Sequence, residues 1–201
     1  SMCLNGKEQS PINITKAVDT NLHPLIFKEG GKATTFINNG HTVQANISNG
    51  NSLEIDGSSY NLLQYHFHTP SENIIDGKSH PLEMHLVHAN KEGNLVVVGV
   101  MFKSTKIRNK KMMKVLRALP LNHGDENDFE SGANGYDFLP VHKEYYKFSG
   151  SLTTPPCSEG VKWFVMKNPV SLSVGQIKQI ENVIGKNNRP IQPTNLRPIL
   201  F

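Results

Sequence analysis

Residues 64–68, Gln-Tyr-His-Phe-His, alternate polar side chains with aromatic rings. Successive side chains of a β-strand point to opposite faces, so His66 and His68 share one face, about 6.5–7 Å apart along the chain. Tyr65 and Phe67 then occupy the other face, which we expect to point into the core. The stretch therefore predicts a half-buried strand that carries two imidazoles on a single face.

A second strand-like run, residues 83–87, adds His85 with Glu83 two positions earlier on the same face. Three neutral imidazoles with an open fourth position are typical of catalytic zinc, whereas structural zinc sites favour thiolates, which this cluster lacks. Metal-bound histidines usually donate their second ring nitrogen to an outer partner, and Gln64 and Glu83 share the ligands' faces. The residues thus predict a three-histidine zinc site on a β-sheet. Two alternatives are a plain pair of packed histidines and a cupin-like oxygenase that binds iron.

The pattern of turns and short runs in the rest of the chain is typical of a mostly antiparallel β-protein with few helices. Frequent Asn-Gly and Asp-Gly turns separate short runs rich in Val, Ile, Thr and aromatic residues, at 33–37, 41–47, 60–68, 82–88, 95–102 and 161–167. Helices are expected at 106–119 and at 174–184, where Ser173 and Gln176 form a capping box and Gly185 marks the end. Residues 187–201 hold three prolines and predict an extended strap over the surface.

Composition limits the class of protein further. With 201 residues and 37% hydrophobic content, the chain suffices for one domain with a substantial core. The net charge is +4, and the one dense basic run, 103–117, fits the solvated face of an amphipathic helix better than a nucleic-acid patch. No apolar run approaches the ~20 residues that a membrane span needs. Cys3 and Cys157 either stay free or pair, and their separation alone does not decide between the two.

Six segments of the chain resemble the motifs of the α-class carbonic anhydrases, in the family's order and with its intervals. They are QSPINI at 9–14, NNGH at 38–41, QYHFHTPSEN at 64–73, LEMHLVH at 82–88, GSLTTPPCSEGVKWFV at 150–165 and NNRPIQP at 187–193. The HTPSEN motif and the two cysteines resemble those of the bacterial, exported branch of the family. The resemblance implies one domain over residues 1–201, mostly β with a few short helices. Its large, mainly antiparallel twisted sheet would hold the active site in a cone-like cleft.

The activity that the resemblance implies is reversible hydration of CO2 to bicarbonate and a proton. A Zn²⁺ ion would lower the pKa of bound water, zinc-bound hydroxide would attack CO2, and a histidine shuttle would export the proton. Anion and sulfonamide inhibitors are expected, nucleic acid is not, and a homodimer is left open. The exported branch implies a periplasmic or secreted protein whose signal peptide has been removed.

Carried over position by position, the family pattern assigns roles to individual residues. Thr153 resembles the hydroxyl that donates to Glu72 and so accepts a hydrogen bond from the nucleophile, and His41 matches the proton shuttle. The remaining assignments form five sets: zinc ligands His66, His68 and His85; their supports Gln64, Glu83 and the Asn187 carbonyl; the apolar CO2 wall of Val87, Val97, Leu152, Val161 and Trp163; Thr154 and the Thr153 amide for bicarbonate; and Asn39 and Gln44 for relay waters. The pattern also pairs Cys3 with Cys157.

Two features depart from simple expectation. By strand parity His41 shares a face with Val43 and Ala45, which predicts burial, so the shuttle role requires a kink after the Asn-Asn-Gly turn. Only eight residues precede Gln9, where family members carry an aromatic-rich segment with a relay tyrosine. We therefore expect an N-terminally shortened domain with an incomplete proton network. A carbonic-anhydrase-like binding protein without catalysis is the alternative.

Overall fold

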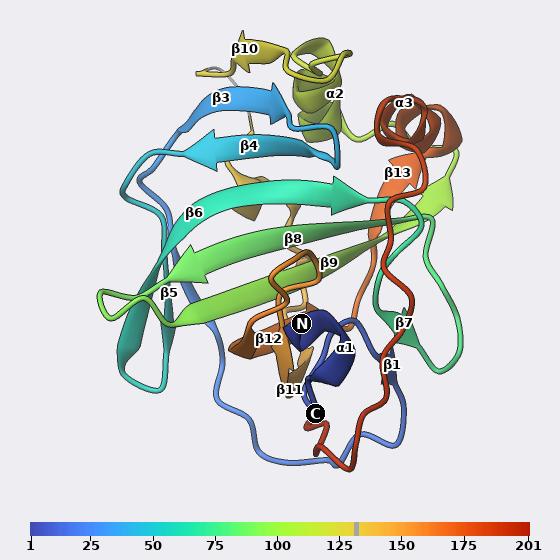
Figure 1. Ribbon diagram of the computed structural model, residues 1–201. Coiled ribbons are helices and arrows are strands. Elements are labelled where there is room, and N and C mark those ends of the chain that lie inside the picture. Colours follow the sequence, from blue (N-terminus) through green and yellow to red (C-terminus); the bar gives the residue numbers. More distant parts are fainter. Residues whose placement is uncertain (131–132) are drawn as a thin grey trace.

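The computed structural model describes residues 1–130 and 133–201. Its large sheet has 11 strands. They are β2 (Ile26–Lys28), β3 (Ala33–Asn38), β4 (Val43–Ile47), β5 (Ser52–Ile55), β6 (Ser58–His68), β8 (Leu82–Ala89), β9 (Leu95–Thr105), β10 (Glu126–Asp128), β11 (Tyr145–Ser151), β12 (Glu159–Met166) and β13 (Val170–Ser173). The main path runs β10-β3-β4-β6-β8-β9-β12-β11, and this order can be followed across Figure 1.

This sheet is mixed but mainly antiparallel, as the sequence predicted. Strands β12 and β13 run parallel to β9, while the other neighbours in the sheet are antiparallel. A separate small sheet pairs β1 (Asn13–Ile14) with β7 (Ile74–Ile75) in parallel. All six predicted strand runs lie on observed strands. The run at 41–47 was predicted two residues too long, because β4 begins at Val43.

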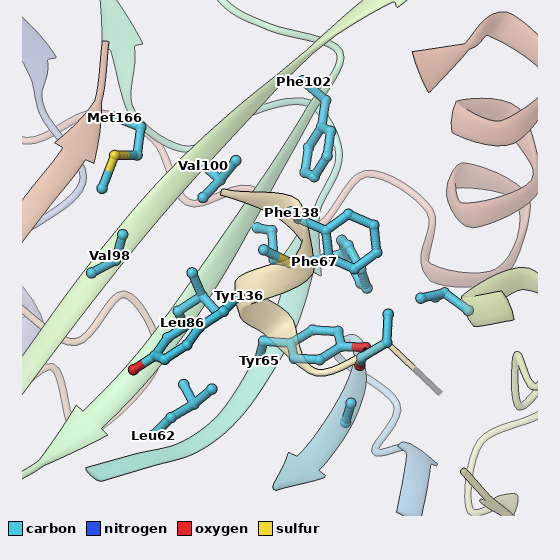
Figure 2. Packing of buried hydrophobic residues seen from close by; sticks show 14 of the residues in the cluster. Leu62, Tyr65, Phe67, Leu86, Val98, Val100, Phe102, Tyr136, Phe138 and Met166 are labelled. Carbon is cyan, nitrogen blue, oxygen red and sulfur yellow. Dashed lines mark hydrogen bonds between the residues drawn. The ribbon is translucent and has the colours of Figure 1, made fainter. Parts of the chain in front are cut away.

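The two faces of the sheet carry different cores. Figure 2 shows one face, where Tyr65, Phe67 and Leu86 pack with the rings of Tyr136 and Phe138 from the short 3-10 turn η1 (Gly135–Phe138). Tyr65 and Phe67 are both 0% exposed, which confirms that they point into the core. The opposite face carries a second apolar cluster around Ile12, Ile14, Val87, Val97, Phe148, Val161, Trp163 and Val165.

A register shift in β6 decides which side chains reach the second face. The pairing with β8 slips between Leu62 and Gln64, and the intervening Leu63 is 45% exposed. Leu62 and Tyr65 therefore share the first core although they are three residues apart, which strict alternation would forbid. Because the shift precedes Gln64, the glutamine and the two histidines after it all face away from that core.

The helices follow local signals. Helix α3 (Val174–Ile184) begins after Ser173 and shows the predicted capping box with Gln176. Helix α2 (Lys110–Arg117) is shorter than the predicted 106–119. It starts late because Thr105 still belongs to β9, and because the Asn109 side chain accepts from the N–H groups of the first helical turn. None of the helices in residues 1–130 and 133–201 combines the length and apolarity that crossing a bilayer requires.

The two ends of the chain lie together. Figure 1 shows helix α1 (Met2–Asn5) beside the C-terminal segment, and the Asn195 amide donates to the Lys7 carbonyl at 2.8 Å. Residues 187–201 form no helix or regular strand, so the predicted extended strap is confirmed. A disulfide joins Cys3 to Cys157, as the family pattern implied. This bond ties the N-terminal segment to the loop that follows β11.

Candidate metal centre

Three histidines converge on the second face of the sheet. His66 on β6 lies directly opposite His85 on β8, and His68 follows two residues later on the same face. One ring nitrogen from each of the three lies within 4.8 Å of the other two. The ring centroids are 5.0 Å apart for His66 and His68, 5.3 Å for His66 and His85, and 4.5 Å for His68 and His85. Strand alternation predicted the first pair, and the β6–β8 register adds the third ring.

The outer nitrogens of two of these imidazoles each face a side-chain oxygen: His66 makes a hydrogen bond, and His85 makes a close contact with a carboxylate. His66 Nδ1 lies 2.8 Å from Gln64 Oε1, and His85 Nε2 lies 3.0 Å from Glu83 Oε1. A neutral imidazole that donates from one nitrogen keeps a lone pair on the other. His66 Nε2 and His85 Nδ1 are therefore the atoms left to bind a metal. Gln64 and Glu83 lie where a zinc site needs its supporting partners.

The buried polar atoms of the site fit a metal ion. Among the described residues, both ring nitrogens of His68, the Nε2 atom of His85 and the Oε2 atom of Glu72 are buried without a hydrogen bond of good geometry. Unsatisfied buried polar atoms are unfavourable, and a cation between the three rings would engage the free imidazole nitrogens. The donor set of three imidazoles without thiolate is the one that catalytic zinc prefers.

The protein surroundings control the charge of the rings. Burial, together with the neighbouring His85, lowers the pKa of His66 to about 3. Burial, together with the neighbouring His85 and His66, lowers the pKa of His68 well below its usual value, and only the interaction with the Asn187 backbone opposes this. Burial also disfavours the charged form of His85, but the Glu83 and Glu72 carboxylates outweigh it and raise the pKa of that imidazole. Two of the three imidazoles thus remain neutral even in mild acid, which leaves them able to coordinate a metal.

Glu83 is enclosed by hydrogen-bond donors. Its Oε2 accepts from the backbone N–H groups of Glu72 and Asn73, both at 2.8 Å, and its Oε1 accepts from Asn73 Nδ2 at 2.8 Å. The carboxylate is 0% exposed, so these bonds replace water around a buried charge. A Cβ on Gly99 of the neighbouring strand would lie 2.9 Å from Glu83 Oε1. The absence of a side chain at position 99 makes room for the carboxylate.

Glu72 is a second buried carboxylate beside the rings. Its Oε2 lies 3.5 Å from His68 Nε2 and 3.8 Å from His85 Nδ1, and its Oε1 accepts from the Arg189 backbone N–H at 2.8 Å. Burial raises the pKa of the Glu72 carboxyl, while His85, the Arg189 N–H and the Thr153 side chain act against this rise. The Thr153 hydroxyl approaches this carboxylate without completing a hydrogen bond to Oε2. The two residues that the family pattern couples are therefore neighbours.

A cavity of about 610 Å³ opens above the histidines. Its lining includes His66 and His68, together with Asn39, His41, Thr42, Gln44, Gln64, Thr154, Pro155, Ile184, Lys186 and Asn187. The expected break in strand alternation after the Asn-Asn-Gly turn is present, so His41 escapes the burial that parity alone would impose. Strand β4 begins only at Val43, after Gly40 with φ of 84°, so the alternation does not extend to His41 and its side chain is exposed.

Two polar residues beside His41 hold the loop in shape. Asn39 Oδ1 accepts from the N–H groups of His41 and Thr42 at 3.0 and 2.9 Å. The Asn187 amide donates to the His41 carbonyl at 2.9 Å. Gln44 also faces the cavity, and its Nε2 donates to Asn46 Oδ1 at 2.8 Å. The structure thus brings the three predicted relay positions to the lining of one cavity.

The side chains predicted to form the apolar wall belong to the core on the same face of the sheet as the three histidines. Val87, Val97, Val161 and Trp163 are buried in the second core, and Leu152 packs against them. The Trp163 ring centroid stands 4.8 Å from that of His85. Trp163 therefore borders the third imidazole directly.

Sequence reasoning missed three residues that hold the site together. Asn73 braces Glu83, the Thr69 N–H donates to Asn187 Oδ1 at 2.9 Å, and Arg189 donates to Glu72. All three lie inside the quoted motifs, at 64–73 and 187–193. The only signal in the sequence was an arginine inside an otherwise proline-rich strap, which is an unusual place for a side chain with five donors.

Comparison with known proteins agrees with this geometry. The family profile described as eukaryotic-type carbonic anhydrase matches residues 1–201. A carbonic anhydrase of Pectobacterium atrosepticum is 44% identical over 201 residues, which are 100% of this chain and 82% of that protein. The solved Photobacterium profundum α-carbonic anhydrase superposes with a TM-score of 0.96 at 46% identity, covering 100% of this chain and 92% of that one. The α-carbonic anhydrase of Thermovibrio ammonificans, solved in complex with the inhibitor sulfanilamide, superposes with a TM-score of 0.96 at 42% identity, covering 100% of this chain and 89% of that one.

Proposed function

The chain belongs to the carbonic anhydrase family of the eukaryotic, or α, type, and from this premise we propose that it catalyses zinc-dependent, reversible hydration of CO2 to bicarbonate and a proton. One observation carries the proposal: one ring nitrogen from each of His66, His68 and His85 lies within 4.8 Å of the other two, and His66 and His68 line a cavity. Family members of known structure with the same fold support it. The cupin-like alternative is rejected, because the chain has the fold and motifs of another family.

The three histidines would hold the zinc, with Gln64 and Glu83 fixing the outer nitrogens of two of them. When bound, zinc makes water acidic enough to act as a nucleophile near neutral pH, a property known for this family. The buried Glu83 carboxylate keeps the proton of His85 on Nε2, which leaves Nδ1 as a lone-pair donor.

Thr153 and Glu72 would orient the nucleophile. The Arg189 N–H holds Glu72 Oε1, so Oε2 is left to accept from Thr153. A hydroxyl that donates to a carboxylate has only lone pairs to offer to its other neighbour. The nucleophile must then donate to Thr153 and direct its own lone pair elsewhere, toward the carbon of CO2. Ligands that can only accept hydrogen bonds are disfavoured at this position.

The substrate and product would use different walls. CO2 has no net charge and is suited to the apolar side chains of Val87, Val97, Leu152, Val161 and Trp163, of which Trp163 packs against His85. Bicarbonate is an anion with acceptor oxygens, and the Thr154 hydroxyl and the Thr153 amide are donors on its way out. Thr154 lines the cavity, which supports this assignment.

His41 would carry the proton from the cavity to solvent. An imidazole can both accept and release a proton, which is what a proton shuttle requires. The exposed side chain at the cavity lining supports this role, and Asn39 and Gln44 would order the intervening water. The disulfide between Cys3 and Cys157 supports the proposal that the protein works in an oxidising compartment, periplasmic or extracellular.

The test is stopped-flow CO2 hydration by the zinc-loaded protein, with sulfanilamide as inhibitor. We expect hydration well above the buffer rate, and inhibition by the sulfonamide. His41→Ala should lower turnover by on the order of tenfold or more in dilute buffer and recover it when imidazole is added. His142→Ala, which changes an exposed histidine away from the cavity, is the matched control. Zinc-loaded protein without hydration would instead establish the binding-protein alternative.

A further inference from the structure

Arg189 connects the buried Glu72 to the N-terminal segment. Its backbone N–H donates to Glu72 Oε1 at 2.8 Å. Its guanidinium donates to three oxygens of another part of the chain: Ser10 O at 2.7 Å and Gln9 Oε1 at 3.0 Å through Nη1, and Cys3 O at 2.9 Å through Nη2. Glu72 and Cys3, far apart in the sequence, are therefore linked through one residue.

The N-terminal segment is in turn fixed to the loop that carries Thr153. Cys3 is disulfide-bonded to Cys157, four positions after that threonine. Gln9 Nε2 donates to the Cys157 carbonyl at 3.1 Å. A closed circuit thus runs from Glu72 through Arg189, the N-terminal segment and the disulfide, and back to Thr153.

We propose that Arg189 is a positioning residue for catalysis: its guanidinium clamps the C-terminal strap to the N-terminal segment, so that its backbone N–H holds the Glu72 carboxylate with Oε2 toward Thr153. The inference rests on the proposed function, in which Glu72 and Thr153 orient the nucleophile. Arg189 touches neither substrate nor metal ligand and acts only through Glu72.

The geometry explains why an arginine is needed. Three acceptor oxygens spread around one planar group match the fixed fork of a guanidinium, whereas a lysine ammonium is a point charge on a flexible stem. The anchoring oxygen of Glu72 receives its bond from the same residue, so loosening the clamp frees the carboxylate to rotate. Rotation would break the preference of Thr153 for nucleophiles that donate a hydrogen bond.

The chain offers a matched control for this clamp. Arg197 on the same strap donates to four carbonyls, Thr194 O, Ser149 O, Gln9 O and Pro193 O, at 2.6–2.9 Å. Arg197→Lys therefore loosens the strap in a comparable way, at a site with no bond to Glu72. Arg189→Lys keeps the backbone N–H and removes only the fork.

The experiment compares the two zinc-loaded lysine variants with the parent protein in three measurements. Turnover should fall by on the order of tenfold in Arg189→Lys and by less than about twofold in Arg197→Lys. Sulfanilamide, which keeps an N–H donor, should bind Arg189→Lys more weakly, whereas iodide, an acceptor-only ligand, should bind it equally or more tightly. Amide hydrogen exchange of the metal-free proteins should speed up at residue 189 in Arg189→Lys alone.

Loss of sulfanilamide and iodide binding in parallel, or equal effects of the two lysine variants, would overturn the proposal. Combining Arg189→Lys with Cys3→Ser/Cys157→Ser provides a second arm, because members of one circuit should give effects that do not add. Additive effects would count against it. If the parent protein lacks hydration activity, the proposed function fails, while the exchange at residue 189 still reports on the clamp.

Discussion

Replacing Glu83 with glutamine tests how the site holds its third imidazole. Glu83 Oε2 accepts from two backbone N–H groups, and Oε1 accepts from Asn73 Nδ2 and lies 3.0 Å from His85 Nε2. A glutamine has one acceptor oxygen in place of two. Its NH2 group must therefore face donors in either orientation.

The two orientations fail in different ways. With the NH2 at the Oε2 position, two buried backbone donors lose their acceptor, at roughly 1–3 kcal/mol each, or about 2–6 kcal/mol of unfolding free energy. With the NH2 at the Oε1 position, it meets the Asn73 amide, which cannot turn over because Asn73 Oδ1 accepts from Ile12 N at 3.1 Å. His85 must then move its proton to Nδ1, which removes the lone pair that would bind zinc. Loss of such an outer partner lowers metal affinity about 10–100-fold.

The assay is thermal unfolding of the metal-free variant together with a competition titration for zinc. We expect a fall in melting temperature of about 4 °C or more, or a zinc dissociation constant raised by at least about tenfold, or both. Glu54→Gln, which removes an exposed carboxylate paired with Lys28, is the control and should change neither quantity measurably. A Glu83→Gln protein with unchanged melting temperature and zinc affinity would refute the reasoning.

Three further predictions concern stability. Cys3→Ser/Cys157→Ser removes a disulfide between residues 154 positions apart, and loss of this constraint on the unfolded chain should lower the free energy of unfolding by about 5 kcal/mol. Denaturant unfolding measures this free energy, and a decrease below about 1 kcal/mol would contradict the stabilising role of the disulfide. Burial lowers the pKa of His88 to about 4, so the unfolded chain binds the proton first and stability should fall by about 3 kcal/mol as pH drops from 6.5 toward 4. His88→Gln should flatten that slope, and an unchanged slope would assign it to other groups. Gly99→Ala places a Cβ against the Glu83 carboxylate and should destabilise the metal-free protein by about 1–3 kcal/mol. Gly175→Ala, where the added Cβ meets open space, is the control and should cause no such loss. Equal melting temperatures of the two variants would contradict the prediction and show that the sheet relaxes around the added methyl group.

Much of the fold could be predicted from local pattern. Each of the predicted features depends on a short stretch of sequence: the six runs of β-branched and aromatic residues, the Ser173 cap and the C-terminal strap. Strand β11 was missed because its sequence, YYKFSGS, ends in small polar residues that are buried only through pairing with β12. The early start predicted for α2 has a similar cause, since β9 extends to Thr105 through its pairing with β13.

The candidate site also combines features that local pattern predicts with features that depend on the pairing of distant segments. Parity within β6 places His66 and His68 on one face, but the register that sets His66 opposite His85 is a property of two strands and depends on the slip beside Leu63. The kink that frees His41 from parity had to be assumed until β4 was seen to begin at Val43. The Arg189 clamp joins segments more than a hundred residues apart, and no local rule connects them.

The most direct test of the account is metal analysis of the purified protein paired with CO2 hydration, before and after chelation and in His68→Ala. The account predicts about one zinc ion per chain, and hydration that disappears on chelation, returns with zinc and is abolished in His68→Ala. Protein that carries its full zinc but hydrates CO2 no faster than buffer, and binds no sulfonamide, would contradict it.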